Sequence, residues 1–163
     1  NMFRYKLLYD KGGIWVDTDV ICLKYFYLPR GYLFASQIND GERWASTAFL
    51  KIPKSRCKGR DVIQECLTEI EKRDREEVKH GEIGPDLLQK ILQKKGIPKS
   101  PKYFANPINW EDCPAKLIEP GGRVDPRATL LHLNNSRFNH ENIDLDKDYP
   151  NSLFQKYKDL YGK

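Results

Sequence analysis

The sequence lacks any long apolar run. Along its 163 residues no stretch approaches the ~18 apolar residues of a membrane-spanning helix, and no segment has the pattern of a signal peptide. Its 4 cysteines show no Cys-x-x-Cys spacing, which argues against a zinc site. Cys22 and Cys66 lie in apolar patterns and are predicted to be small buried hydrophobes. This use of cysteine favours a reducing, cytoplasmic location, with the Golgi lumen as the alternative if a membrane anchor was removed.

The sequence also lacks a basic stripe interleaved with aromatic residues. Its 28 basic and 23 acidic residues give a net charge of +5, and they alternate in sign as on a solvated surface. A nucleic-acid partner is therefore not expected, although the small excess would favour an anionic ligand such as a nucleotide diphosphate. A hydrophobic content of 39% is too high for disorder, and residues 1–163 are predicted to form a single domain.

Helical and strand-like patterns alternate along the chain. Helices are predicted at residues 2–10, 60–74, 84–96 and 153–161. Strands are predicted at residues 14–23, 32–37, 46–52, 115–118 and 128–133, and a polar turn follows the last of them. This alternation predicts an α/β fold in which helices pack on a sheet.

Two carboxylates, Asp17 and Asp19, follow a short apolar run (residues 14–16) that begins after the glycine pair 12–13. At a strand end the backbone bends, so two such side chains can converge on one cation. Hard oxygen ligands of this kind suit Mg²⁺ or Mn²⁺, which take further oxygens from substrate phosphates. The alternative is a solvated strand end that carries two aspartates by chance.

The wider pattern, from Arg4 through the glycine pair to Asp19, resembles the signature of the DXD-containing sugar-transferase group. This group includes a mannosyltransferase family, the α-1,4-glycosyltransferases and, more distantly, the clostridial glucosylating toxins. In these families a helix with Asp-x-x-Arg leads into a Gly-Gly turn and a strand that ends in the metal-binding Asp-x-Asp. The chain departs from the pattern at Asn1, which stands where the family has the aspartate.

The resemblance implies a GT-A-like mixed sheet with flanking helices. In the resembled families a nucleotide-binding unit precedes this signature, so the chain is expected to be a fragment of a longer domain that lacks part of that unit. The implied activity is metal-dependent transfer of a hexose-type sugar from a UDP- or GDP-sugar to a glycan, glycoprotein or other hydroxyl acceptor, with retention favoured. Mn²⁺ or Mg²⁺ is the implied cofactor. A catalytically impaired nucleotide-sugar-binding module and a metal-dependent nucleotidyltransferase are the alternatives.

Two later segments match further parts of the family picture. The Gly-Pro pair 84–85 resembles a motif at the start of a helix that lines the sugar pocket, which implies catalytic roles for Asp86 and for Arg4. Asp86 could instead complement the dipole of that helix. His132, near the end of the last core strand, is implied to be a metal ligand, and its alternative role is that of a satisfied core histidine.

The implied site residues therefore fall into two further groups. The implied metal ligands are Asp17, Asp19 and His132. The implied donor-binding residues are Arg4, Asp17, Asp19, Ser136 and Arg137. Arg137 replaces the tryptophan of the family, and its planar fork matches phosphate geometry. Trp44, Ser46 and Thr47 could border the donor sugar, whereas Trp110 is expected to be structural.

Overall fold

The first helix runs directly into the first strand through a turn that requires glycine. In the computed structural model, which describes residues 1–74, 78–79 and 81–162, helix α1 (Met2–Lys11) ends at Gly12 and strand β1 (Gly13–Val16) follows. Gly12 has φ 68° and ψ −167°, a backbone conformation that is nearly exclusive to glycine. A Cβ atom there would lie 2.6 Å from the backbone nitrogen of Lys54. The glycine pair therefore fixes the angle between α1 and β1.

A long hairpin provides the centre of the first sheet. Strands β3 (Leu33–Asn39) and β4 (Glu42–Ile52) are joined by Asp40 and Gly41, both with positive φ, as a tight two-residue hairpin turn requires. The sheet has the order β1-β4-β3, and both of its pairings are antiparallel. Because β1 pairs with β4, the end of β1 lies beside the middle of the hairpin.

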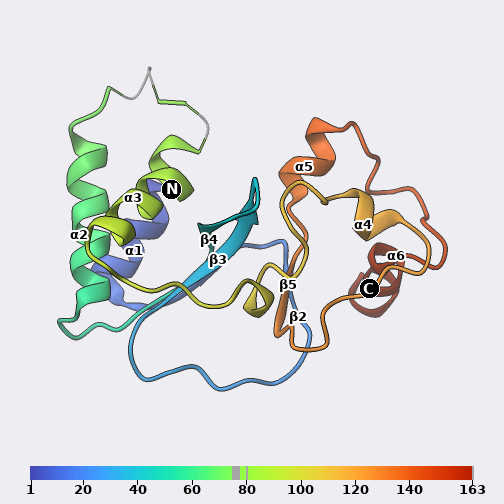
Figure 1. Cartoon of the computed structure of the whole chain (residues 1–163), viewed down its shortest axis with the longest axis horizontal. Helices are drawn as coiled ribbons and strands as arrows, with labels where there is room; N and C mark the ends of the chain where they lie inside the picture. Colours follow the sequence, from blue (N-terminus) through green and yellow to red (C-terminus); the bar gives the residue numbers. More distant parts are fainter. Residues whose placement is uncertain (75–77, 80, 163) are drawn as a thin grey trace.

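Helices α1, α2 (Lys58–Glu71) and α3 (Leu87–Lys94) cover one face of this sheet (Figure 1). Successive side chains of a strand point to opposite faces, so the register partners Phe34 and Leu50 face these helices. Their neighbours Ala35 and Phe49 belong to a second core on the other side. The hairpin is thus buried on both faces.

A smaller sheet lies on the other side of the hairpin. It pairs β2 (Val20–Cys22) with β5 (Leu130–His132). Phe49 of the hairpin shares a core with Leu130 of β5 and Val20 of β2, and this core links the two sheets. The rings of Phe26 and Phe104 also pack on Phe49, with centroids 6.5 and 5.2 Å away. Short turns at Glu82–Asp86 and Lys102–Phe104 precede α3 and follow it, respectively.

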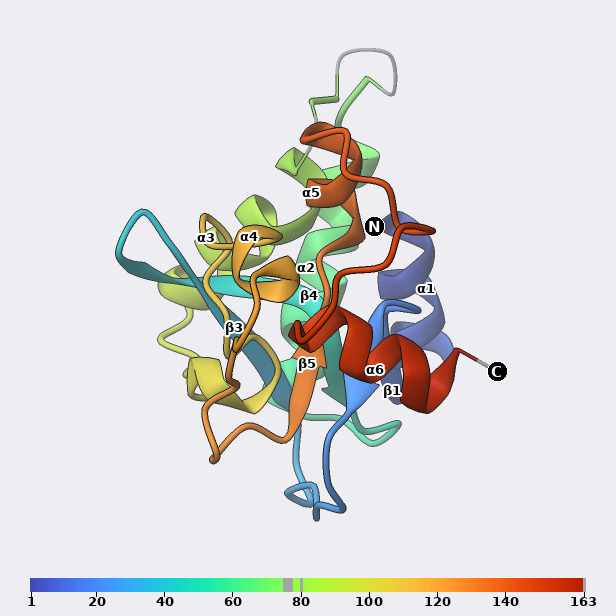
Figure 2. The ribbon, with the colours of Figure 1, turned by 90° about the vertical axis from the view of Figure 1, so that its right-hand side faces the viewer.

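Three short helices surround the smaller sheet, as Figure 2 shows. They are α4 (Ala115–Ile118), α5 (Asn135–His140) and α6 (Leu153–Tyr161). Phe138 of α5 and Phe154 of α6 share a hydrophobic core with Leu131 of β5. The α/β class is confirmed, and the arrangement is consistent with a GT-A-like domain. Among the described helices, none has both the length and the apolar character needed to cross a membrane.

Several sequence-based predictions are corrected by these elements. For the predicted strand 14–23 the sequence left open whether the carboxylates lie in its middle or at a break. The structure has the break, at residues 17–19, and the two halves belong to different sheets. The predicted strand 115–118 is helix α4, because backbone N–H groups of this segment donate to carbonyls three or four residues earlier and only Leu117 in it is buried. The turn expected after the last strand is helix α5. Cys66 is buried as predicted, but Cys22 is exposed.

Candidate functional site

The broken strand places the aspartate pair between the two sheets. The backbone N–H of Asp17 donates to Ala48 at the end of the β1–β4 pairing, at 2.9 Å. The carbonyl of Asp19 accepts from Leu133 N–H, also at 2.9 Å, beyond the end of β5. The backbone of Asp17 is therefore bonded to the larger sheet and the backbone of Asp19 to the smaller sheet. The Asp-x-Asp segment bridges the two.

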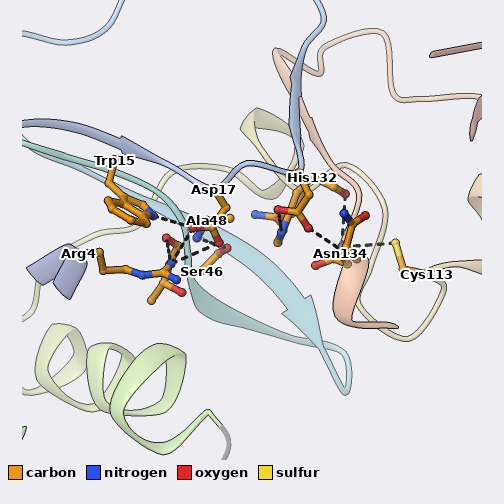
Figure 3. Close-up of polar contacts among 12 residues, drawn as sticks. Arg4, Trp15, Asp17, Ser46, Ala48, Cys113, His132 and Asn134 are labelled. Carbon is orange, nitrogen blue, oxygen red and sulfur yellow. Dashed lines mark hydrogen bonds and ion pairs between the residues drawn. The ribbon is translucent and has the colours of Figure 1, made fainter. Parts of the chain in front are cut away.

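Arg4 and Trp15 hold the first carboxylate in place (Figure 3). The Arg4 guanidinium lies 3.0 Å from Asp17 Oδ1 and donates at 2.7 Å to the carbonyl of Thr47. Its Cζ stacks 5.0 Å from the centroid of the Trp15 ring, and Trp15 Nε1 donates to Asp17 Oδ1 at 2.6 Å. The Arg4 and Asp17 side chains are only 17% and 22% exposed, so this ion pair is partly shielded from water.

The second carboxylate contacts the late histidine. His132 Nε2 lies 3.3 Å from Asp19 Oδ1, and Asp19 Oδ2 accepts the backbone N–H of Asn135 at 2.9 Å. Burial raises the pKa of Asp19, but the hydrogen bond and charge interaction with His132, together with the Asn135 N–H, outweigh it and hold the pKa below its usual value. Asp19 is therefore ionised at neutral pH and can serve as a ligand for a cation.

Asp17, Asp19 and His132 form a donor set that fits a divalent metal. One ligand atom from each lies within 4.8 Å of the others, so a single ion could contact all three. Two hard carboxylate oxygens and one imidazole nitrogen are accepted ligand types for the divalent ions of such sites. The structure thus brings together the three metal ligands that the sequence suggested.

Two buried asparagines support this site and were not foreseen from the sequence. Asn106 Oδ1 lies 3.0 Å from His132 Nδ1. Asn134 has the left-handed backbone conformation (φ 56°, ψ 52°), and its Nδ2 lies 3.4 Å from the carbonyl of His132. Its Oδ1 is buried and has no hydrogen-bond partner among the described residues. The sequence offered a signal for Asn134 alone, which lies two residues after His132. Asn106 is 26 residues from His132 and had no such signal, since isolated asparagines are common in loops.

A cavity of about 780 Å³ opens beside the metal donor set. Its walls include most of the predicted site residues: Arg4, Asp17, Asp19, Asp86, His132 and Ser136, together with Trp44, Ser46 and Thr47. Segments that are far apart in the sequence therefore meet around one space that is large enough for a ligand of drug size.

Asp86 reaches this cavity from the start of a helix, as predicted. Helix α3 is assigned from Leu87, but Asp86 already has helical dihedral angles (φ −69°, ψ −46°) and follows a turn that is kinked at Gly84. The Asp86 side chain makes no capping hydrogen bond. Its Oδ1 instead accepts from Trp44 Nε1 at 3.3 Å. A Cβ on Gly84 would lie 2.5 Å from the Asn1 side chain, so the glycine allows this turn to approach α1 closely.

Arg137 is the predicted donor-binding residue that does not line the cavity in the described part of the chain. Its Nε donates to the carbonyl of Cys113 at 3.0 Å, its terminal nitrogen pairs with Glu141 at 2.5 Å, and its Cζ lies 5.5 Å from the Trp110 ring centroid. Trp110, which was expected to be structural, does line the cavity. Arg137 therefore contacts the cavity indirectly, because it packs on Trp110, which lines it.

Comparison with known families agrees with this geometry. Residues 1–44 match the model of a family described as "Glycosyltransferase sugar-binding region containing DXD motif". This segment is therefore similar to the sugar-binding region of the DXD glycosyltransferases. The matched residues include Arg4, Asp17, Asp19 and Trp44, and the match confirms the resemblance seen in the motif. A search of curated proteins finds no significant match to the chain.

Proposed function

We propose that this region belongs to a metal-dependent glycosyltransferase that moves a hexose-type sugar from a nucleotide-diphosphate sugar to a hydroxyl acceptor. The observation that carries the proposal is the convergence of Asp17, Asp19 and His132 within 4.8 Å on the wall of the 780 Å³ cavity. A diphosphate needs a cation beside it, and the sugar needs a space with polar walls next to that cation. In this proposal the three side chains would hold the cation, and the cavity beside them would hold the sugar.

In this proposal Asp19 and His132 hold a divalent cation, Mn²⁺ or Mg²⁺, with Asp17 beside them. When bound, the cation offsets the negative charge that grows on the departing nucleoside diphosphate. Arg4 fixes the position of Asp17 because its guanidinium contacts both carboxylate oxygens, Oδ1 at 3.0 Å and Oδ2 at 3.3 Å. Preorganised charge of this kind needs little rearrangement during reaction.

The opposite wall would hold the sugars. Asp86 is oriented by Trp44, and its carboxylate can accept a hydrogen bond from a hydroxyl of donor or acceptor. When donor and acceptor are bound in the correct orientation, their translational and rotational entropy is already lost before the reaction, and this lowers the activation free energy. The resemblance favours retention of the anomeric configuration, which proton couplings at the anomeric carbon of the product would test.

Release of the nucleoside diphosphate tests the proposal directly. The chain is incubated with a panel of UDP- and GDP-sugars, with Mn²⁺, with Mg²⁺ or with EDTA. We expect release of UDP or GDP that EDTA abolishes and added metal restores. Asp19→Asn should lower the rate at least ~100-fold, because the charge that holds the cation is lost.

The matched control is Asp10→Asn, since Asp10 is a surface carboxylate whose only ion pair within the described residues is with Lys6, at 2.9 Å. This variant should keep the wild-type rate. An Asp19→Asn chain that is as active as the wild type would contradict the metal assignment. Binding of a nucleotide sugar without turnover would indicate the binding module, and release of pyrophosphate would indicate nucleotidyl transfer.

A further inference from the structure

The geometry around His132 points to a role for Asn106: we propose that Asn106 is a positioning residue that holds the neutral His132 ring as its Nδ1–H tautomer and thereby directs the Nε2 lone pair towards Asp19 and the metal site. Asn106 itself does not line the cavity. It would act through the histidine and not on a substrate.

The first step of the argument concerns the orientation of the Asn106 amide. Its side chain lies 2.9 Å from the backbone carbonyl of Ser36 on one side and 3.0 Å from His132 Nδ1 on the other. A backbone carbonyl can only accept, so the NH₂ group of Asn106 must face Ser36. The amide oxygen is therefore the atom that faces the histidine.

The second step concerns the proton on the ring. An amide oxygen can only accept a hydrogen bond, so His132 Nδ1 must donate. In the neutral ring a single nitrogen carries the proton, and with that proton on Nδ1 the Nε2 atom has only its lone pair. This lone pair lies 3.3 Å from Asp19 Oδ1, which is also an acceptor. Two acceptors that face each other at this distance require a cation between them or a second ring proton on Nε2, and that second proton makes the hydrogen bond to Asp19 described above for the site without metal.

The third step concerns rigidity. Asn106 is 1% exposed, and its backbone N–H donates to Lys102 at 2.9 Å. The backbone N–H of His132 donates to Ala105, the residue before Asn106, at 3.0 Å. Both partners of the side-chain hydrogen bond are thus fixed through their backbones. In metal sites, a fixed partner on the second ring nitrogen of a histidine sets its tautomer and orientation, and loss of that partner lowers metal affinity 10–100-fold.

The direct test is the tautomer of His132 in the metal-free chain, measured by ¹⁵N chemical shifts at a pH at which the ring is neutral. The signal is assigned by comparison with His132→Gln. We expect the Nδ1–H form in the wild type, although a free histidine side chain in water favours Nε2–H. Asn106→Leu should shift the ring towards Nε2–H. Nε2–H in the wild type, or an unchanged tautomer in Asn106→Leu, would overturn the proposal.

A conservative variant separates positioning from folding. Asn106→Asp keeps an acceptor oxygen next to Nδ1, but it replaces the donor to Ser36 by a second acceptor and adds a buried charge. It should therefore retain the Nδ1–H signature although it is less stable. Loss of that signature in a folded Asn106→Asp chain would contradict the proposal. Should Asn106→Leu fail to fold, the wild type and Asn106→Asp still decide the question.

The consequence for the metal rests on the proposed function and is measured separately, by calorimetric titration with Mn²⁺ alone. Asn106→Leu should weaken Mn²⁺ binding ~10–100-fold. Gln89→Leu is the matched control, because Gln89 is an equally buried amide (2% exposed) that accepts the backbone N–H of Ala45 outside the cavity lining. It should leave the Mn²⁺ affinity unchanged.

The two measurements fail in different ways. If the wild type binds no Mn²⁺ but the ring is the Nδ1–H tautomer, the proposed function fails and the role of Asn106 stands. If the wild type binds Mn²⁺ and Asn106→Leu binds it equally well, the role of Asn106 in the metal site is refuted and the proposed function stands.

Discussion

The ion pair between Arg4 and Asp17 should contribute substantially to the stability of the chain. Replacement of Arg4 by Met keeps a long apolar side chain against Trp15 but removes the guanidinium. Asp17 then loses its 3.0 Å ion pair, and the carbonyl of Thr47 loses its 2.7 Å donor. Asp17 keeps one strong partner, Trp15 Nε1, so its charge is not left without a hydrogen bond.

The magnitude follows from the burial of the two partners. A hydrogen bond to a charged group contributes ~1.5–3 kcal/mol, whereas exposed ion pairs contribute at most about 1 kcal/mol. With the two side chains 17% and 22% exposed, the expected loss in the free energy of unfolding is about 2 kcal/mol. For a chain of this length that corresponds to a decrease in Tm of ~4–8 °C.

The matched control is Arg60→Met. Arg60 also stacks on an aromatic ring, with Cζ 4.3 Å from the centroid of Tyr9, and also donates to a backbone carbonyl, that of Lys54. Among the described residues, Arg60 forms no ion pair with a carboxylate. We expect it to cost less than about 1 kcal/mol. Urea unfolding followed by circular dichroism gives both values. Equal losses for the two variants would refute the argument from the ion pair.

Three further outcomes are expected. Asp86→Asn should lower kcat ~100-fold with the fold retained if Asp86 orients hydroxyls, whereas unaltered turnover would return Asp86 to the helix-start role. Gly12→Ala should destabilise the chain by more than about 2 kcal/mol in urea unfolding, because of its backbone conformation and the 2.6 Å approach of Lys54, while Gly31→Ala, which has open space around it, should not. A thiol reagent near pH 8 should modify the exposed Cys22 in the native chain. It should spare Cys66, because burial raises the pKa of this thiol to about 12, and rapid native modification of Cys66 would contradict that burial.

The sequence by itself determined the motif and most of the local elements. The glycine pair, the apolar run and the Asp-x-Asp segment depend on backbone preferences and side-chain periods that act over a few residues. For that reason α1, the hairpin strands, α2 and α6 were placed within a few residues of their observed bounds. Residue chemistry also indicated Asp17 and Asp19 as metal ligands, the family resemblance added His132, and these three side chains lie together.

Only the tertiary structure decided how the motif residues are supported. Asn106 and His132 are 26 residues apart, and a hydrogen bond across that separation leaves no local pattern in the sequence. Arg137 has the chemistry of a phosphate ligand, but its contacts with Cys113 and Glu141 keep it out of the cavity. Packing brings such distant groups together, so its outcome depends on the whole chain.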